Sequence, residues 1–191
     1  MIILCKLTKG TQMNWKQLLL RKAIIARIPY ADKMRQIKRK FFGYPPNADH
    51  LELTIKNYEK IKSSLEHSKG SLNGMTILEI GSGWFPTIPI FLARDGAKKI
   101  FMSDRNAHMD DITFRAITDY LQKSLPNDEY IQSIRNFSSL PIEYLAPFNS
   151  SLLADKSLDV VMSHAVLEHI PKSEIYNLFS SLRPKLSDQG I

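Results

Sequence analysis

The sequence predicts an α/β fold, a parallel sheet flanked by helices with a helical extension before it. Two observations predict this. From residue 75 onward, short runs rich in β-branched residues alternate with longer segments of helical period, which is typical of parallel sheets with right-handed crossovers. Before residue 70, apolar residues recur at intervals of three and four, as in amphipathic helices. We therefore expect two regions, a helical extension over 1–70 and an α/β domain over 71–191.

The extension contains three predicted helices, at 14–27, 31–42 and 49–67. Pro29 ends the first helix, and the breaker "YPPN" separates the second from the third. The third has the clearest stripe of apolar residues, at Leu51, Ile55, Tyr58, Ile61 and Leu65. Residues 1–12 fit no element, so translation from Met13 is an alternative to a start at Met1.

The α/β region contains four predicted strands and three predicted helices. The strands are expected at 75–80, 98–104, 141–148 and 157–164, and the helices at 86–96, 108–125 and 172–186. A fifth strand would begin at Gly190, where the sequence ends. We therefore expect an incomplete sheet whose fourth strand has an open edge. Because open apolar edges promote association, this chain alone should self-associate and show weak activity or none.

Composition and charge limit the function classes. Residues 1–70 hold 15 Lys and Arg against 5 acids, whereas the whole chain of 191 residues has a net charge of +7. The basic region is read either as a solvated helical face or as a surface for an anionic partner. No apolar run approaches the ~20 residues that span a bilayer, and the lone Cys5 cannot form an internal disulfide. A cytoplasmic location follows as the expectation.

A glycine turn follows the first predicted strand. Gly81, Ser82 and Gly83 lie between a strand and a helix, where glycines permit a sharp turn and a close approach of ligand to backbone. A dinucleotide fingerprint would place a third glycine at position 86, which is Pro86. The alternative is a plain tight turn between strand and helix.

Two acids favour a ligand over a plain turn. Asp104 ends the second predicted strand, where a carboxylate can accept the hydroxyls of a ribose or, alternatively, cap a helix. Glu79 precedes the turn by two residues, and its charge would repel a pyrophosphate but attract a cation. Adenosine that carries positive charge, as in S-adenosylmethionine, is therefore the favoured ligand.

These segments resemble class I S-adenosylmethionine-dependent methyltransferases, of the type 11 kind. Residues 77–104, "ILEIGSGWFPTIPIFLARDGAKKIFMSD", are similar to the family's first motif and second strand, and residues 157–171, "SLDVVMSHAVLEHIP", to its fourth strand and the following segment. Phe85 stands where the third glycine of the motif is expected. The resemblance implies a Rossmann-like sheet over about residues 72–191, truncated after the fourth strand and its helix.

The resemblance also implies roles for the site residues. The turn would border the methionine part of the cofactor, Glu79 would orient the turn and act on the amino end, and Asp104 would hold the ribose. The resemblance implies contacts with the adenine from Arg105, Asn149 and Ser150. It implies contacts with the methionine amine from Ser163 and His164.

Catalysis and substrate are less specified. His169 is a candidate general base, because imidazole accepts protons near neutral pH, or it only hydrogen-bonds the backbone. No metal-ligand pattern is present. The preferred acceptor is a small or lipid-linked glycan-type molecule. Peripheral membrane contact through 14–42 is an alternative, and nucleic acid is disfavoured because no RNA-binding module is seen. Two other functions are kept open, a non-catalytic binding module and, less favoured, an NAD-dependent oxidoreductase.

Overall fold

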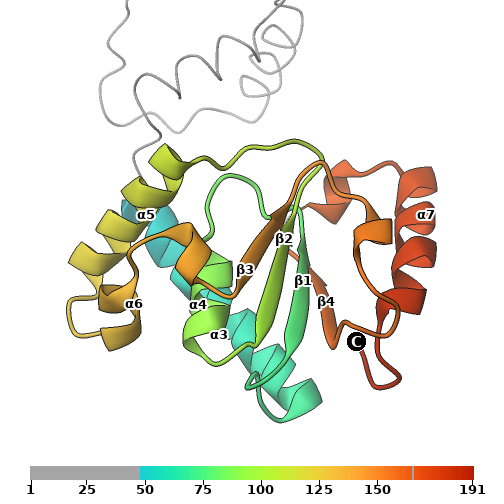
Figure 1. The fold of residues 1–191 in the computed structure, drawn as a ribbon, viewed down its shortest axis with the longest axis horizontal. Helices are drawn as coiled ribbons and strands as arrows, with labels where there is room; N and C mark the ends of the chain where they lie inside the picture. Colours follow the sequence, from blue (N-terminus) through green and yellow to red (C-terminus); the bar gives the residue numbers. More distant parts are fainter. Residues whose placement is uncertain (1–47, 165) are drawn as a thin grey trace, which may run out of the picture. The chain divides into compact units, whose positions relative to one another are not determined.

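A computed structural model describes residues 48–164 and 166–191, which include a four-stranded parallel sheet. The strands are β1 (Thr76–Ile80), β2 (Lys99–Ser103), β3 (Ile142–Leu145) and β4 (Val160–Ser163). Their order is β3-β2-β1-β4 (Figure 1), so the chain reverses its direction of winding at β1, as in Rossmann-like sheets. The predicted fold class is confirmed. The predicted helices at 14–27 and 31–42 lie outside the described residues.

Side chains of the strands alternate between two apolar clusters. Ile77 and Ile100 point into the larger cluster, whereas Leu78 and Phe101 point into the smaller one. Strand register explains the pairing, because Ile77 lies opposite Ile100 and Leu78 opposite Phe101. A sheet that buries apolar side chains on both faces needs helices on both faces, and Figure 1 shows α7 (Lys172–Leu182) on the opposite side of the sheet from α3 and α4.

The helices on the larger cluster are α3 (Ala48–Lys69), α4 (Thr87–Arg94), α5 (Asp111–Ser124) and α6 (Glu129–Ser133). Pro86 precedes the first residue of α4, and Pro89 falls in its first turn, where neither ring interrupts a helical hydrogen bond. The side chain of Asp110 accepts a hydrogen bond from the backbone N–H of Thr113 and caps α5. Helix α5 therefore begins at Asp111, three residues later than predicted. The short helix α6 was not predicted from the sequence.

Helix α3 shares the apolar core of the sheet. The side chains of Tyr58 and Leu65 are buried in the larger cluster with strand and α4 residues. The Tyr58 hydroxyl donates to the Asp95 carboxylate, at 2.7 Å, at the end of α4. The boundary between the two predicted regions at residue 70 stays a prediction, but within the described residues α3 belongs to the same compact unit as the sheet.

The outer edge of β4 pairs with the last residue of the sequence. The N–H of Ile191 donates to the Asp159 carbonyl at 3.0 Å, and the Ile191 carbonyl accepts from the Val161 N–H at 2.8 Å. This is the hydrogen-bond pattern of a parallel neighbour, at the position predicted for a fifth strand. In the described part of the chain, no helix is both long and apolar enough to cross a membrane.

Candidate functional site

The glycine turn lies where β1 ends, with both glycines in the left-handed region. Gly81 has φ +75° and Gly83 has φ +67°, a conformation that residues with a Cβ rarely adopt. The N–H groups of Gly81 and Ser82 both donate to the Ser103 carbonyl at the end of β2, at 2.8 and 3.0 Å. The turn is therefore fixed to the neighbouring strand, as expected for a loop that must keep its shape around a ligand.

A distant side chain also requires a glycine at position 81. A Cβ at Gly81 would lie 2.4 Å from the Cγ2 atom of Val166, in the segment after β4. The same addition at Gly83 would meet no heavy atom within 4 Å. Of the two glycines, then, only Gly81 combines the left-handed backbone with a close neighbour, a difference that could not be predicted from the sequence.

Glu79 is a buried acid with incomplete hydrogen bonding. Its side chain is only 4% exposed, and its register neighbours are Met102 on β2 and Met162 on β4. Among the described residues, the Oε2 atom has no hydrogen-bond partner. Burial raises the pKa of Glu79 to about 7, a hydrogen bond to Ser82 opposes this rise, and the charge of Asp104 adds to it. A nearby cation would offset the cost of ionising this group.

Asp104 connects the glycine turn to the loop after β2. Its Oδ2 atom accepts from the backbone N–H of Gly83 at 3.0 Å. Its Oδ1 atom lies 3.4 Å from the backbone nitrogen of Asn106 and 3.6 Å from the His108 Nε2 atom. Both distances are longer than the hydrogen bond that Oδ2 accepts. The arrangement leaves acceptor capacity at Oδ1 for a hydroxyl group of a ligand.

A cavity of about 570 Å³ opens at the carboxyl ends of β1 and β2. In open α/β sheets, ligands bind at this edge, where the strand order reverses. The cavity brings together four predicted site residues, Gly81, Asp104, Arg105 and His169. Sequence reasoning missed the rest of its wall, including an acid of α7; these residues are Ile80, Ser103, Phe148, Val166, Ile170, Pro171, Glu174 and Leu178.

Glu79 is not among the residues that line this cavity. It lies between Leu78 and Ile80, which point into the smaller cluster beside α7, so the alternation of β1 turns Glu79 to the α4 side. Glu79 can therefore act on a ligand in the cavity only through the glycine turn or through its charge. This agrees with the predicted role of orienting the turn, which stays a prediction.

Six other predicted residues do not line the cavity; these are Ser82, Gly83, Asn149, Ser150, Ser163 and His164. Asn149 is exposed, and its side-chain oxygen accepts from the Ser151 N–H at 3.0 Å, capping the turn that Ser150 begins. The Ser163 hydroxyl donates to the Ile80 carbonyl at 3.2 Å, and His164 is exposed. The Asn149 and Ser163 side chains thus bond to nearby backbone groups, and the predicted contacts of all six residues with a cofactor stay predictions.

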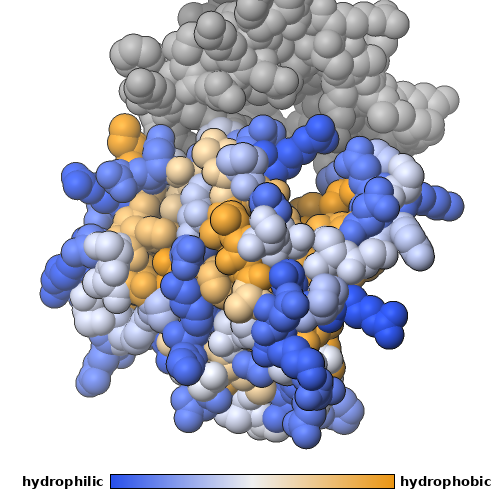
Figure 2. Space-filling model, turned by 45° about the vertical axis from the view of Figure 1, so that its right-hand side comes forward, coloured by the Kyte–Doolittle hydropathy of each residue, from blue (hydrophilic) through white to orange (hydrophobic). Residues whose placement is uncertain are grey.

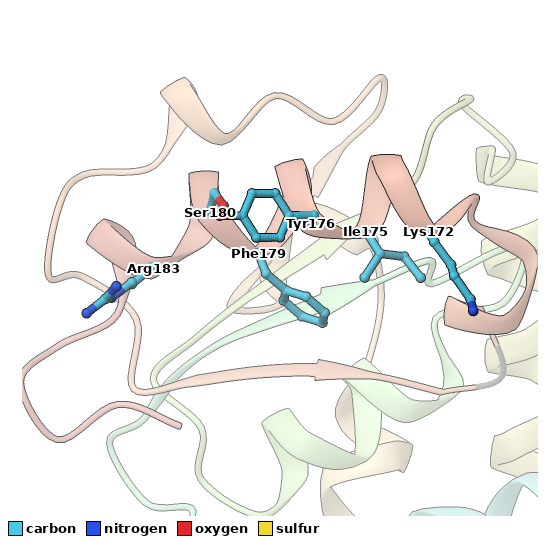
Figure 3. Close-up of a pocket in the computed structure, with 6 residues that line it drawn as sticks. All are labelled: Lys172, Ile175, Tyr176, Phe179, Ser180 and Arg183. Atoms are coloured by element: carbon cyan, nitrogen blue, oxygen red, sulfur yellow. The ribbon is translucent and has the colours of Figure 1, made fainter.

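A second hollow, of about 500 Å³, runs along the outer side of α7 (Figure 3). Tyr176 and Phe179 are 75% and 47% exposed there, with Lys172 and Arg183 at the two ends of the row. On the face of the described residues that Figure 2 shows, apolar side chains are interspersed with hydrophilic ones.

Among residues 48–164 and 166–191, no group of three or more His, Cys, Asp or Glu side chains could hold a metal ion.

Comparisons with known proteins found only structural likeness. No protein-family model matches the chain, and no curated protein matches it. A proposed S-adenosyl-L-methionine-dependent methyltransferase from Methanococcus maripaludis matches with 17% identity and a TM-score of 0.48, covering 83% of this chain and 58% of that chain. Many of the matched structures are described as S-adenosylmethionine-dependent methyltransferases, the family that the sequence resembles.

Two further matches illustrate the range of functions. Phosphoethanolamine N-methyltransferase 1 from Haemonchus contortus matches with 16% identity and a TM-score of 0.48, covering 82% of this chain and 30% of that chain. A dehydroquinate dehydratase and shikimate dehydrogenase from S. pombe matches with 20% identity and a TM-score of 0.42, covering 70% of this chain and 22% of that chain. The chain spans about half the length of the first matches. At these identities and TM-scores, the matches carry no argument about function.

Proposed function

We propose that this chain binds S-adenosylmethionine and transfers its methyl group to an acceptor that is not yet identified. The observation that carries the proposal is the pair of carboxylates, Glu79 and Asp104, on either side of a glycine turn at the ligand-binding edge of the sheet. Glu79 is buried, its pKa is raised, and one of its oxygens has no hydrogen-bond partner within residues 48–164 and 166–191. A cation near the turn would offset this cost, whereas a pyrophosphate would increase it.

The donor set fits the groups of this cofactor. Asp104 Oδ1 has acceptor capacity for ribose hydroxyls, and Arg105 lies in the cavity wall where a planar guanidinium can stack on adenine. The acids Asp104 and Glu174 both line the cavity, which favours a ligand with a sulfonium and an ammonium group. The cofactor would supply a carbon already activated for displacement by its bond to a positively charged sulfur.

The chain's own residues would then orient the acceptor and remove a proton from it. Transfer of a methyl group requires the nucleophile to be in line with the carbon that it attacks. His169 lines the same cavity and is exposed, so its imidazole can meet an acceptor hydroxyl or amine and take its proton. A small or lipid-linked glycan-type acceptor remains the preferred class, and no described residue specifies it.

Isothermal titration calorimetry with S-adenosylmethionine, S-adenosylhomocysteine and NAD tests the binding step. We expect heat with the first two ligands and none with NAD. Heat with NAD alone would replace the proposal with an oxidoreductase. Heat with none of the three would favour a binding module that lacks a cofactor. A labelled-methyl assay on candidate acceptors then tests transfer, with His169→Ala expected to retain binding and to lower turnover by about 10²-fold or more.

A further inference from the structure

His108 lies in the loop after β2 and is contacted by groups from two other parts of the chain. Its ring stacks on the Trp84 indole, with the ring centroids 4.6 Å apart and an angle of 30° between the planes. Its backbone N–H donates at 2.9 Å to the Tyr144 hydroxyl, which itself donates to the Asn106 carbonyl. The imidazole is therefore fixed in one orientation beside the glycine turn.

That orientation places one ring nitrogen opposite the site carboxylate. His108 Nε2 is 3.6 Å from Asp104 Oδ1, whereas Nδ1 is buried and has no partner among the described residues. A neutral imidazole carries one N–H, which can be on either nitrogen. A proton on Nδ1 would leave a buried donor unsatisfied and turn the Nε2 lone pair toward a carboxylate. The tautomer with the proton on Nε2 is therefore favoured, and it points a donor at Asp104.

We infer that His108 is a positioning residue, which holds the Asp104 carboxylate in the orientation that receives the hydroxyls of an adenosine ribose. The Gly83 N–H hydrogen-bonds Oδ2 at 3.0 Å, and His108 Nε2 lies 3.6 Å from Oδ1, so the two groups flank the carboxylate on opposite oxygens. His108 acts through Asp104 and contacts no reacting atom. The inference rests on the proposed function only in taking adenosine as part of the ligand.

A purely structural role would be packing of His108 on Trp84, which ties the turn to the loop after β2. Two variants separate the roles. His108→Phe keeps an aromatic ring on Trp84 but removes the N–H that faces Asp104. His108→Gln removes the stacking ring but keeps a side-chain amide that can donate to the same oxygen. A positioning role predicts that the glutamine variant binds ligand better than the phenylalanine variant, and a packing role predicts the reverse.

The test compares S-adenosylhomocysteine with its 2′,3′-dideoxy analogue by calorimetry on the full chain. We expect His108→Phe to weaken binding of S-adenosylhomocysteine about tenfold, because Asp104 would lose the polar group that flanks Oδ1 and would hold the ribose hydroxyls less well. The dideoxy analogue should bind the parent and the variant equally, because it has no hydroxyl for Asp104 to receive. His108→Gln should stay within about threefold of the parent. Equal losses for both ligands, or no loss in His108→Phe, would overturn the inference.

Adding NAD as a third ligand separates this inference from the proposed function, because NAD also carries an adenosine ribose. If the chain binds NAD and not S-adenosylhomocysteine, methyl transfer is excluded, and the NAD affinities of the two variants decide the role of His108 in the same way. If the parent binds no adenosine ligand, both the proposed function and the role of His108 are wrong.

Discussion

Two carboxylates at the ends of neighbouring elements have opposite environments. Asp95, after α4, accepts from the Tyr58 hydroxyl, the Lys62 ammonium and the Arg94 guanidinium, each at 2.7 Å. Burial alone would raise the pKa of Asp95, but the hydrogen bonds from Arg94, Lys62 and Tyr58 outweigh it and lower the pKa to about 2. For Glu79, at the end of β1, no cation among the described residues contributes to the pKa, and burial raises this pKa to about 7.

The difference indicates what each region is for. The Asp95 cluster joins α3 to α4 with its donors and acceptors matched, so it stabilises the fold. Glu79 leaves one oxygen without a hydrogen-bond partner in the described part of the chain, beside a glycine turn, which costs stability in the absence of a ligand. Perturbed acids in which desolvation is not offset within the protein are typical of functional sites. Variants at the two carboxylates should therefore differ in stability and in the pH dependence of stability.

The largest effect is expected at Asp95. Asp95→Ala should lower the free energy of unfolding by about 3–4 kcal/mol at pH 7, because Lys62 and Arg94 lose a partly buried partner. The pKa of Asp95 is depressed in the folded protein, so its contribution is present above about pH 4 and is lost as pH falls toward 2. Urea unfolding at several pH values measures both effects.

The matched control is Asp188→Ala. Asp188 lies 2.7 Å from Lys156, but the two side chains are 80% and 67% exposed. Exposed pairs contribute little, so this variant should lose less than about 0.5 kcal/mol. If the two aspartate variants lose the same stability, the Asp95 cluster does not have the structural role assigned to it.

At Glu79 the pH dependence of stability has the opposite sign. The folded protein favours the protonated acid, so the free energy of unfolding should fall as pH rises from about 4.5 to 7, by on the order of 3 kcal/mol. Glu79→Gln should abolish this decline and unfold at higher urea concentration than the parent at pH 8. A variant less stable than the parent at pH 8 would mean that the carboxylate finds a partner in solution.

Asp104 should affect ligand binding. Asp104→Ala removes the acceptor for the Gly83 N–H and the proposed ribose acceptor, and it should weaken S-adenosylhomocysteine binding by about 1.5–3 kcal/mol. Asp119→Ala, at an exposed position of α5, is the control and should bind like the parent. Unchanged affinity in Asp104→Ala would remove this residue from the site.

The two glycines of the turn should differ in stability by a smaller amount. Gly83→Ala carries only the cost of a left-handed backbone, about 1 kcal/mol. Gly81→Ala adds the contact with Val166 and should cost about 2 kcal/mol, part of which Val166→Ala should restore in the double variant. Thermal unfolding of the four proteins compares them. Equal costs at Gly81 and Gly83 would show that Val166 moves aside freely.

Local pattern was sufficient to predict much of the fold. The alternation of period in the sequence placed all four strands, and Gly81 and Gly83 have the positive φ angles expected of a sharp turn. Asp104 follows β2 and meets the turn, because the carboxyl ends of parallel strands share one edge. The prediction failed where the signal is short, as in α6, which has five residues and less than two turns of helical period.

Long-range contacts explain what the sequence could not predict. Val166 lies 85 positions after Gly81, and only the pairing of β4 with β1 brings them together. The direction of Glu79, away from the cavity wall, depends on which face of the sheet α4 covers. Glu174 had a weak signal, as an acid in the first turn of a helix that follows the strand-end segment, but its place in the wall depends on how α7 packs.

We propose that Glu79 is a site acid that requires a cationic ligand. Calorimetric titration of S-adenosylmethionine into the parent and into Glu79→Gln, at pH 6 and pH 8, tests it most directly. Titration of the ligand itself is common to both proteins, so the difference between them reports on Glu79. We predict that the parent binds more tightly than the variant at pH 8, and that this advantage shrinks at pH 6, where Glu79 is protonated. Equal affinities of the two proteins at pH 8 would contradict the claim.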